Sequence, residues 1–119
     1  MKHFKWDEIP AERVNDHFVR KLAWDSKMMV ARTEVEKGYV VPAHSHPNEQ
    51  ITWVMSGTWR FTLEGKTLDV GPNEMISIPS NVVHSAEAVE TLVAYDIFTP
   101  VREDWLNGDD SYLRKQARS

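Results

Sequence analysis

The amino-acid sequence predicts an all-β protein built as one domain, with antiparallel strands arranged as a sandwich or barrel. Short runs rich in β-branched and aromatic residues recur along the chain, as is typical of strands. Residues that turn or stop a strand separate these runs, and few stretches have a helical pattern. The length of 119 residues suits a single domain, and no repeat, low-complexity segment or linker divides residues 1–119.

Eight strand-like runs are expected, over residues 17–24, 28–35, 50–56, 58–63, 66–70, 74–79, 82–88 and 91–98. Gly57 and Gly65 take positive φ angles at little cost, so each predicts a hairpin turn between the runs that flank it. Pro72 and Pro79 stop a strand ladder because proline has no backbone N–H to donate.

Helical structure is expected in two places only. The first is "WDEIPAERV", residues 6–14, and the second is a short helical or irregular C-terminal tail, "EDWLNGDDSYLRKQ", residues 103–116. The cluster "LRKQARS", residues 113–119, is the one basic cluster of the sequence, and we interpret it as a frayed, solvated tail.

Composition excludes several classes of function. The sequence has no cysteine, so disulfides and thiolate metal ligands are ruled out. A formal net charge of -4 without a concentrated basic surface argues against binding to nucleic acid. No apolar run approaches the roughly 18 residues that span a bilayer, and the first residues lack a secretory signal. We therefore expect a cytoplasmic protein with neither membrane nor nucleic-acid partners.

The run over residues 50–56 has bulky side chains on both of its faces. In an extended strand Gln50, Thr52 and Val54 share one face, whereas Ile51, Trp53 and Met55 share the other. We expect the first face to line a barrel, and the second to be covered by another sheet or another subunit. On this ground a homodimer is expected.

Three histidines carry the chemistry of the sequence. His44 and His46 lie two residues apart, so an extended backbone places both imidazoles on one side. Gln50 adds an amide oxygen, and His84 opens a later strand that can lie beside the first segment. Neutral imidazole is the commonest metal-binding side chain, although a lone H-x-H pair also occurs on ordinary exposed loops.

The wider spacing favours a metal site. The pattern G-x5-H-x-H-x3-(E/Q)-x6-G is reproduced by Gly38, His44, His46, Gln50 and Gly57. The segment "NEMISIPSNVVH", residues 73–84, reproduces a second pattern that ends at His84. Together the two motifs resemble those of the cupin superfamily. The resemblance implies a jelly-roll β-barrel with a metal at its centre and a metal-binding core over about residues 38–102.

The sequence departs from the cupin pattern at three places. Gln50 stands at the usual glutamate position, and spacing alone leaves Glu49 open as a substitute, although Gln50 shares the inward face of Thr52. Asn73-Glu74 replaces a Gly-Asp pair, and Asn81 replaces a glycine. Asparagine tolerates left-handed backbone, so the turns are expected to survive.

A shell of three imidazoles and one amide is electrically neutral, so it leaves the charge of a divalent ion uncompensated. This favours a small anionic ligand at the open positions and suits a metal that acts as a Lewis acid on a carboxylate or hydroxy-keto substrate. Nitrogen and oxygen ligands admit one divalent Ni, Zn, Fe, Co, Cu or Mn ion, and the sequence does not choose among them.

An aspartate interrupts the apolar run "TLVAYDIF". Asp96 shares a strand face with Phe98, and burial of a lone carboxylate is costly, so Asp96 must be paired, protonated or exposed to a cavity. One interpretation is an ion pair with Arg102, or an outward orientation; the other is an acid–base group in the metal pocket. Phe98 is either a wall of that pocket or ordinary core.

The segment "YDIFTPVREDWL", residues 95–106, narrows the resemblance to the KdgF family of pectin-degradation cupins. That resemblance implies conversion of 4,5-unsaturated uronate monosaccharides, the products of pectin and alginate lyases, into linear 4-deoxy-5-keto uronates without redox change. Carried over by position, it implies the metal ligands His44, His46, Gln50 and His84 and the active-site trio Asp96, Phe98 and Arg102.

Other interpretations remain open at this level. A cupin dioxygenase acting on a small diol or diketone, a non-catalytic module that binds a sugar acid or other small anion, and a protein with a vestigial site all fit parts of the pattern. Trp59 and Phe61 are expected in the core, and His3 and His17 on the surface.

Overall fold

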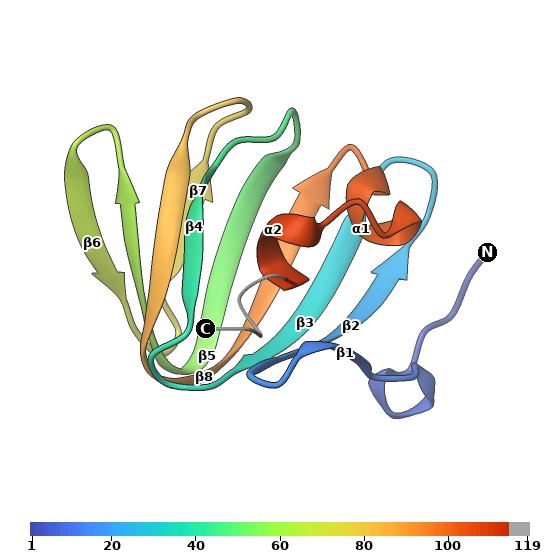
Figure 1. Cartoon of the computed structure of the whole chain (residues 1–119). Helices are drawn as coiled ribbons and strands as arrows, with labels where there is room; N and C mark the ends of the chain where they lie inside the picture. The colour runs from blue at the N-terminus through green and yellow to red at the C-terminus, as the bar shows by residue number, and fades with distance from the viewer. Residues whose placement is uncertain (115–119) are drawn as a thin grey trace.

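The computed structural model describes residues 1–114, in which one eight-stranded sheet bends round to form an open barrel (Figure 1). The elements in chain order are η1 Trp6–Glu8, β1 Glu12–Asn15, β2 Phe18–Trp24, β3 Met29–Val35, β4 Val40–His44, β5 Glu49–Leu63, β6 Lys66–Val70, β7 Met75–Ile78, β8 His84–Thr99, α1 Glu103–Asn107 and α2 Ser111–Arg114. All strand pairs are antiparallel, so the predicted all-β fold with a short helical C-terminal segment is confirmed.

Two long strands hold the barrel together. The sheet order is β1-β2-β3-β8-β5-β6, while β4 pairs with β8 and β7 pairs with β5. In Figure 1, β5 and β8 run through the bend at the base of the view and so belong to both halves of the sheet. Helix α2 lies between these halves, and α1 lies over the half that contains β2 and β3 (Figure 1). This arrangement directs inward side chains of β4, β5 and β8 towards the C-terminal segment.

The hairpin turn expected at Gly57 is wrong. Residues 50–56 and 58–63 form one strand, β5, which bends and shifts its register against β8 near Gly57. Gly57 has φ +77°, and a Cβ at this position would meet the backbone oxygen of Thr91 and lie 2.7 Å from Leu92 Cα. Positive φ therefore serves a bulge here and not a turn. The expected runs 82–88 and 91–98 are likewise one strand, β8, which pairs along its length with β5.

The other turn predictions are confirmed. Glu64 and Gly65 both have positive φ, and they join β5 to β6 as a two-residue hairpin. Asn73 and Asn81 also have positive φ, at 63° and 65°, as expected for asparagines in the places of glycines. The backbone N–H of Asn81 donates to the carbonyl of His46, so this turn also fixes a histidine-bearing loop.

The N-terminal helix expected over residues 6–14 is wrong, because only the 3-10 turn η1 forms. Pro10 follows it, and β1 then pairs with β2, which buries Val14 and Asn15. Strand pairing and burial thus outweigh a weak helical pattern. The C-terminal helical prediction is confirmed by α1 and α2, which Gly108 separates at φ 79°.

Of the basic cluster over residues 113–119, which was expected to be frayed, the structure describes Leu113 and Arg114. Residues 115–119 lie outside the described part of the chain. Leu113, by contrast, is buried at 2% exposure, and Arg114 pairs with Asp110 and Glu12. The first part of the tail is therefore packed against the barrel and is not frayed.

The two faces of β5 separate as predicted. Gln50, Thr52 and Val54 are buried, whereas Ile51 and Trp53 on the other face are each 37% exposed. No second sheet of the described residues covers that outer face, so the homodimer stays a prediction. None of the described helices has the length and apolar character needed to cross a membrane.

Candidate metal centre and adjoining pocket

Three histidines from separate segments meet inside the barrel. His44 ends β4, His46 lies in the loop before β5, and His84 begins β8, directly opposite His44 in the strand register. One ring nitrogen from each lies within 4.8 Å of the others. The ring centroids of His44 and His84 are 4.3 Å apart, and those of His46 and His84 are 5.0 Å apart. A single cation can therefore contact all three imidazoles.

Each imidazole is oriented by a backbone carbonyl two residues away. The Nδ1 atoms of His44, His46 and His84 lie 2.8, 3.0 and 2.9 Å from the carbonyl oxygens of Pro42, Asn48 and Val82, respectively. A carbonyl oxygen only accepts, so each Nδ1 carries the ring hydrogen and each Nε2 presents a bare lone pair. Such outer hydrogen bonds fix the tautomer and direction of metal-binding histidines.

The imidazoles are also held neutral. Burial lowers the pKa of His44 to about 4 and that of His46 to about 4, and the nearby charge of Arg102 acts in the same direction. Burial likewise lowers the pKa of His84. Near neutral pH, the rings therefore have free lone pairs and carry no proton that a metal ion must displace.

Gln50 completes the donor set. Its side-chain Oε1 lies 3.1 Å from Nε2 of His46, and its amide Nε2 donates to Oγ1 of Thr52 at 2.8 Å. With the ring hydrogen of His46 on Nδ1, Nε2 of His46 and Oε1 of Gln50 face each other as two acceptors with no hydrogen between them. Such an arrangement suits a cation, so the residues fit a divalent metal ion. Glu49 is exposed on the opposite face of β5.

Asp96 lies on β8 opposite Thr52 and points into the same pocket. Its Oδ1 accepts a hydrogen bond of 2.6 Å from the Thr52 hydroxyl. Burial raises the pKa of Asp96 to about 6, although the Thr52 hydrogen bond and the charge of Arg102 oppose the rise. Among residues 1–114 Asp96 forms no ion pair with Arg102 and is not directed outward, so these two interpretations of Asp96 are wrong, and its catalytic role stays a prediction.

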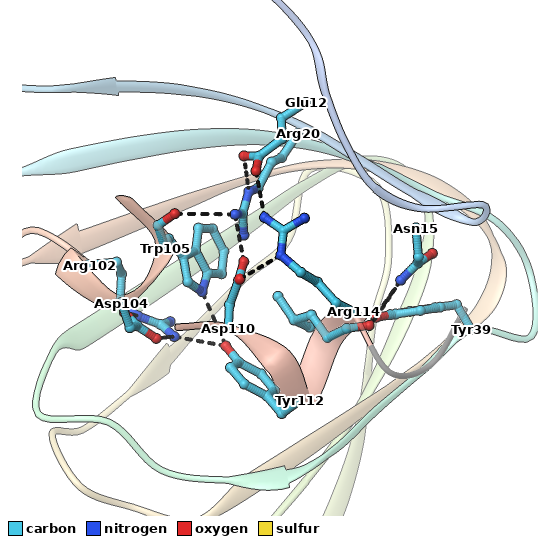
Figure 2. Close-up of polar contacts among 11 residues, drawn as sticks. Glu12, Asn15, Arg20, Tyr39, Arg102, Asp104, Trp105, Asp110, Tyr112 and Arg114 are labelled. Atoms are coloured by element: carbon cyan, nitrogen blue, oxygen red, sulfur yellow. Dashed lines mark hydrogen bonds and ion pairs between the residues drawn. The ribbon is translucent and has the colours of Figure 1, made fainter. Parts of the chain in front are cut away.

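Arg102 instead pairs with Asp104. Nε and Nη2 of Arg102 donate to the two carboxylate oxygens of Asp104 at 2.9 and 2.8 Å, and Nη2 also donates to the Tyr112 hydroxyl at 2.8 Å (Figure 2). The guanidinium lies over the rings of Phe98 and Trp105, at 4.9 and 4.6 Å from their centroids. Phe98 lines the pocket and is also part of the core. Its ring lies edge-on to the ring of His46.

Three of these partners were not identified from the sequence. Asp104, Trp105 and Tyr112 form the surroundings of Arg102, and the ring of Tyr112 stacks on His44 with centroids 4.7 Å apart. Asp104 could have been identified from the sequence, because it is an acidic residue only two positions after Arg102. Tyr112 had none, because its position depends on how α2 folds back over the barrel.

A second polar cluster holds α2 in place. Arg20, fully buried on β2, donates to Asp110 at 2.6 Å and to Glu12 at 2.8 Å (Figure 2). Arg114 donates to the same two carboxylates, and the Arg20 guanidinium lies 4.4 Å from the centroid of the Trp105 ring. This cluster ties the C-terminal segment to β1 and β2, and it thereby positions Tyr112.

The pocket between these groups is small. Its lining includes His44, His84, Gln50, Asp96, Arg102 and Tyr112. The cavity volume is about 40 Å³, which holds a metal ion and a few water molecules. Trp59 and Phe61 are buried in the core, as expected, and line its apolar end. His3 and His17 are exposed, also as expected.

Comparisons with known proteins agree with this geometry. Residues 31–98 match the family model described as the cupin domain. The chain is similar to the structure of KdgF from Halomonas sp., with 28% identity, a TM-score of 0.81, and coverage of 87% of this chain and 99% of that one. An RmlC-like cupin from Shewanella frigidimarina NCIMB 400 has 21% identity, a TM-score of 0.82, and coverage of 88% and 96%, and shares the fold.

A curated relative is also found. An uncharacterised protein of Streptomyces coelicolor is 26% identical over 102 residues, which cover 84% of this chain and 97% of the relative. Both the KdgF structure and this relative are matched over almost their whole length.

Proposed function

The chain belongs to the cupin domain family, and from that premise we propose that it opens and ketonises 4,5-unsaturated uronate monosaccharides. The observation that carries the proposal is the placement of one buried carboxyl group, Asp96, in a pocket lined by His44 and His84, two of the three convergent imidazoles. Similarity to the KdgF structure over 99% of that chain supports the same function.

The proposed metal ligands are His44, His46 and His84, whose ring nitrogens lie close together, and Gln50, whose Oε1 faces Nε2 of His46. A bound divalent transition metal supplies positive charge that stabilises negative charge developing on substrate oxygens. The four side chains contribute no negative charge of their own, and Asp104 offsets the charge of Arg102, so the charge of the bound ion stays uncompensated. The pocket therefore favours an anionic substrate, and a uronate carboxylate meets this requirement.

Arg102 contributes to substrate binding through one atom. Asp104 and Tyr112 occupy Nε and Nη2, and no hydrogen bond within residues 1–114 involves Nη1. Nη1 is therefore the donor that remains for a substrate carboxylate, in a single-point contact in place of the two-point clamp that a free guanidinium would make.

Asp96 is the proposed acid–base group. In the reaction the bond between C1 and the ring oxygen breaks, the anomeric hydroxyl loses a proton, C5 becomes a ketone and C4 gains a proton. The change is an isomerisation and needs no oxidant or reductant. A carboxyl group with a pKa of about 6 exists in both protonation states near neutral pH, as delivery of one proton and recovery of another require.

The size of the cavity adds a requirement. A monosaccharide is larger than this cavity of about 40 Å³, so the proposal needs part of the substrate to lie at the pocket mouth or the wall beside Tyr112 to shift. Within residues 1–114, helix α2 is held by its polar cluster, by Leu113 and by Tyr112, whose hydroxyl group accepts from Arg102 and Trp105.

The test is an assay of the metal-loaded protein on the monosaccharides released by a pectin or alginate lyase. Conversion is followed by loss of the ultraviolet absorbance of the C4=C5 double bond and by NMR of the product. We expect Asp96→Asn to abolish turnover while its metal content, measured by elemental analysis, stays that of the wild type. Full activity in this variant would refute the acid–base role.

The same preparation separates the competing functions. Oxygen uptake with a small diol or diketone, without conversion of the uronate, would identify a dioxygenase. Tight binding of a sugar acid without conversion would identify a binding module. Failure to retain any divalent ion would show that the site is vestigial. Each of these three results would refute the proposed function.

A further inference from the structure

Thr52 lies between the two groups that the proposed site depends on most. It sits on β5 with no exposed surface, two residues after Gln50 on the same strand face and directly opposite Asp96 on β8. Its hydroxyl oxygen lies 2.8 Å from the Gln50 amide nitrogen and 2.6 Å from Asp96 Oδ1. One hydroxyl group therefore joins a candidate metal ligand to the candidate acid–base group.

The hydrogen atoms in this chain of contacts can be counted. The amide nitrogen of Gln50 only donates, so the Thr52 oxygen accepts from it. Thr52 has a single hydroxyl hydrogen, which is directed to Asp96 Oδ1. With its nitrogen held by Thr52, the Gln50 amide turns Oε1 towards Nε2 of His46. The hydrogen bond that Thr52 accepts from Gln50 thus sets the directions of the other contacts between His46, Gln50, Thr52 and Asp96.

From this count we propose that Thr52 is a positioning residue with two effects. It fixes the Gln50 carboxamide so that Oε1, and not Nε2, faces the three imidazoles. It also holds Asp96 Oδ1 as a hydrogen-bond acceptor, which leaves Oδ2 as the atom that carries the exchanged proton. The second effect rests on the proposed function, whereas the first concerns metal binding alone.

The opposite arrangement shows why the two effects are linked. If a proton sat on Asp96 Oδ1, that O–H would donate to Thr52, and the Thr52 hydrogen would lose its acceptor. The Thr52 oxygen could accept from Asp96 and Gln50 together, but its own buried hydrogen would then be unpaired, which is costly. Otherwise the Thr52 hydrogen would turn to Gln50, which would present Oε1 to Thr52 and its amide hydrogens to the imidazoles. An amide NH2 has no lone pair for a metal ion, so metal binding through Gln50 disfavours a proton on Oδ1.

Valine is nearly the same shape as threonine but has no hydroxyl group, and serine keeps the hydroxyl group. We therefore compare Thr52→Val and Thr52→Ser, with Gln50→Leu and the double variant T52V/Q50L. The affinity for Co²⁺ is measured by competition with a chelator, and the ligand set is read from the visible ligand-field spectrum of the bound Co²⁺.

We expect Thr52→Val to weaken Co²⁺ binding by about 10-fold or more, as for other losses of outer-shell partners. Its spectrum should shift towards that of Gln50→Leu, because the carboxamide is no longer aimed. Thr52→Ser should stay within about 3-fold of the wild type. The double variant should lose no more affinity than Gln50→Leu alone, since both changes remove the same contact.

Wild-type affinity in Thr52→Val, or losses that add in the double variant, would overturn the proposal. If Thr52→Val does not fold, NMR of the Zn²⁺-loaded wild type decides: the Gln50 side-chain NH2 must show contacts to Thr52, and contacts to the imidazole protons instead would overturn the proposal. None of these measurements uses a uronate. They therefore test the effect of Thr52 on metal binding independently of the proposed function.

Discussion

The carboxylate of Asp104 accepts hydrogen bonds from both Nε and Nη2 of Arg102, at 2.9 and 2.8 Å. Burial raises the pKa of Asp104, but the guanidinium outweighs this effect and holds the pKa below its ordinary value. Asp104 is thus an anion that offsets the charge of Arg102 close to three imidazoles. This pairing sets the electrostatic balance of the pocket.

Removal of the Asp104 charge should weaken metal binding. In Asp104→Asn the Arg102 charge is no longer offset, so the potential at His44, His46 and His84 becomes more positive. We expect the dissociation constant for Zn²⁺ to rise several-fold, as measured by chelator competition. Asp69→Asn, which removes an exposed carboxylate far from the pocket, serves as the control and should leave it unchanged. An unaltered affinity in Asp104→Asn would show that the pair does not influence the centre.

Ionisation of Asp96 should destabilise the metal-free protein as the pH rises. Its pKa in the folded state is raised from 3.8 to about 6, so the protonated carboxyl group favours folding below pH 3.8, and this contribution is lost as the pH rises through about 6. The loss is of the order of 3 kcal/mol.

Asp96→Asn is the matched comparison, because it keeps the shape and cannot ionise. Urea unfolding of both metal-free proteins between pH 4 and pH 7.5 should show wild type losing stability relative to the variant. Contributions from the histidines are common to both proteins and cancel. A difference that is constant with pH would mean that the Asp96 carboxyl titrates near its ordinary value.

The pair formed by Arg20 and Asp110 should contribute strongly to stability. Both side chains have no exposed surface, so Asp110→Ala leaves a buried guanidinium without one of its partners. We expect a loss of roughly 3 kcal/mol in the free energy of unfolding, and a change in Trp105 fluorescence because Arg20 lies over that ring. The exposed pair of Arg60 and Asp69 is the control, and Arg60→Ala should have no measurable effect. Equal effects of the two substitutions would contradict the assignment.

Gly57 and Gly65 provide a matched pair for the bend in β5. Both have positive φ, at 77° and 73°, so alanine is strained at either position. A Cβ at Gly57 also collides with the backbone of Thr91 and Leu92, whereas one at Gly65 meets nothing within 4 Å. We expect Gly57→Ala to cost at least about 2 kcal/mol more than Gly65→Ala in urea unfolding. Similar costs would mean that β5 can relax away from β8.

The hydroxyl group of Tyr112 should act on substrate and not on the metal. It accepts hydrogen bonds from Arg102 Nη2 and Trp105 Nε1, so its own hydrogen remains available towards the pocket. We expect Tyr112→Phe to retain metal affinity but lower kcat/KM for the uronate about 10-fold, as for the loss of one hydrogen bond. The chelator assay and the double-bond assay measure the two effects separately. Reduced metal affinity with unchanged kcat/KM would reverse this assignment.

Local pattern was sufficient for much of the site. Alternation along residues 50–56 correctly placed Gln50 and Thr52 inside, and the histidine spacing identified three rings that do converge. For Asp96 the sequence left an ion pair with Arg102, an outward orientation and a place in the pocket open, and the structure places it in the pocket. The roles of these residues in metal binding and catalysis stay predictions. Each successful inference used side chains a few positions apart, where the geometry of an extended strand leaves little freedom.

The sequence by itself determined the antiparallel β fold, the inward face of β5 and the histidine cluster, because strand alternation and turn chemistry act over a few residues. Only the tertiary structure decided that Gly57 bends a strand, that Asp104 pairs with the guanidinium of Arg102, and that the ring of Tyr112 covers His44. These contacts depend on which β5 backbone atoms approach β8 and on where a buried arginine on β2 anchors α2. Such long-range packing leaves no local signal in the sequence.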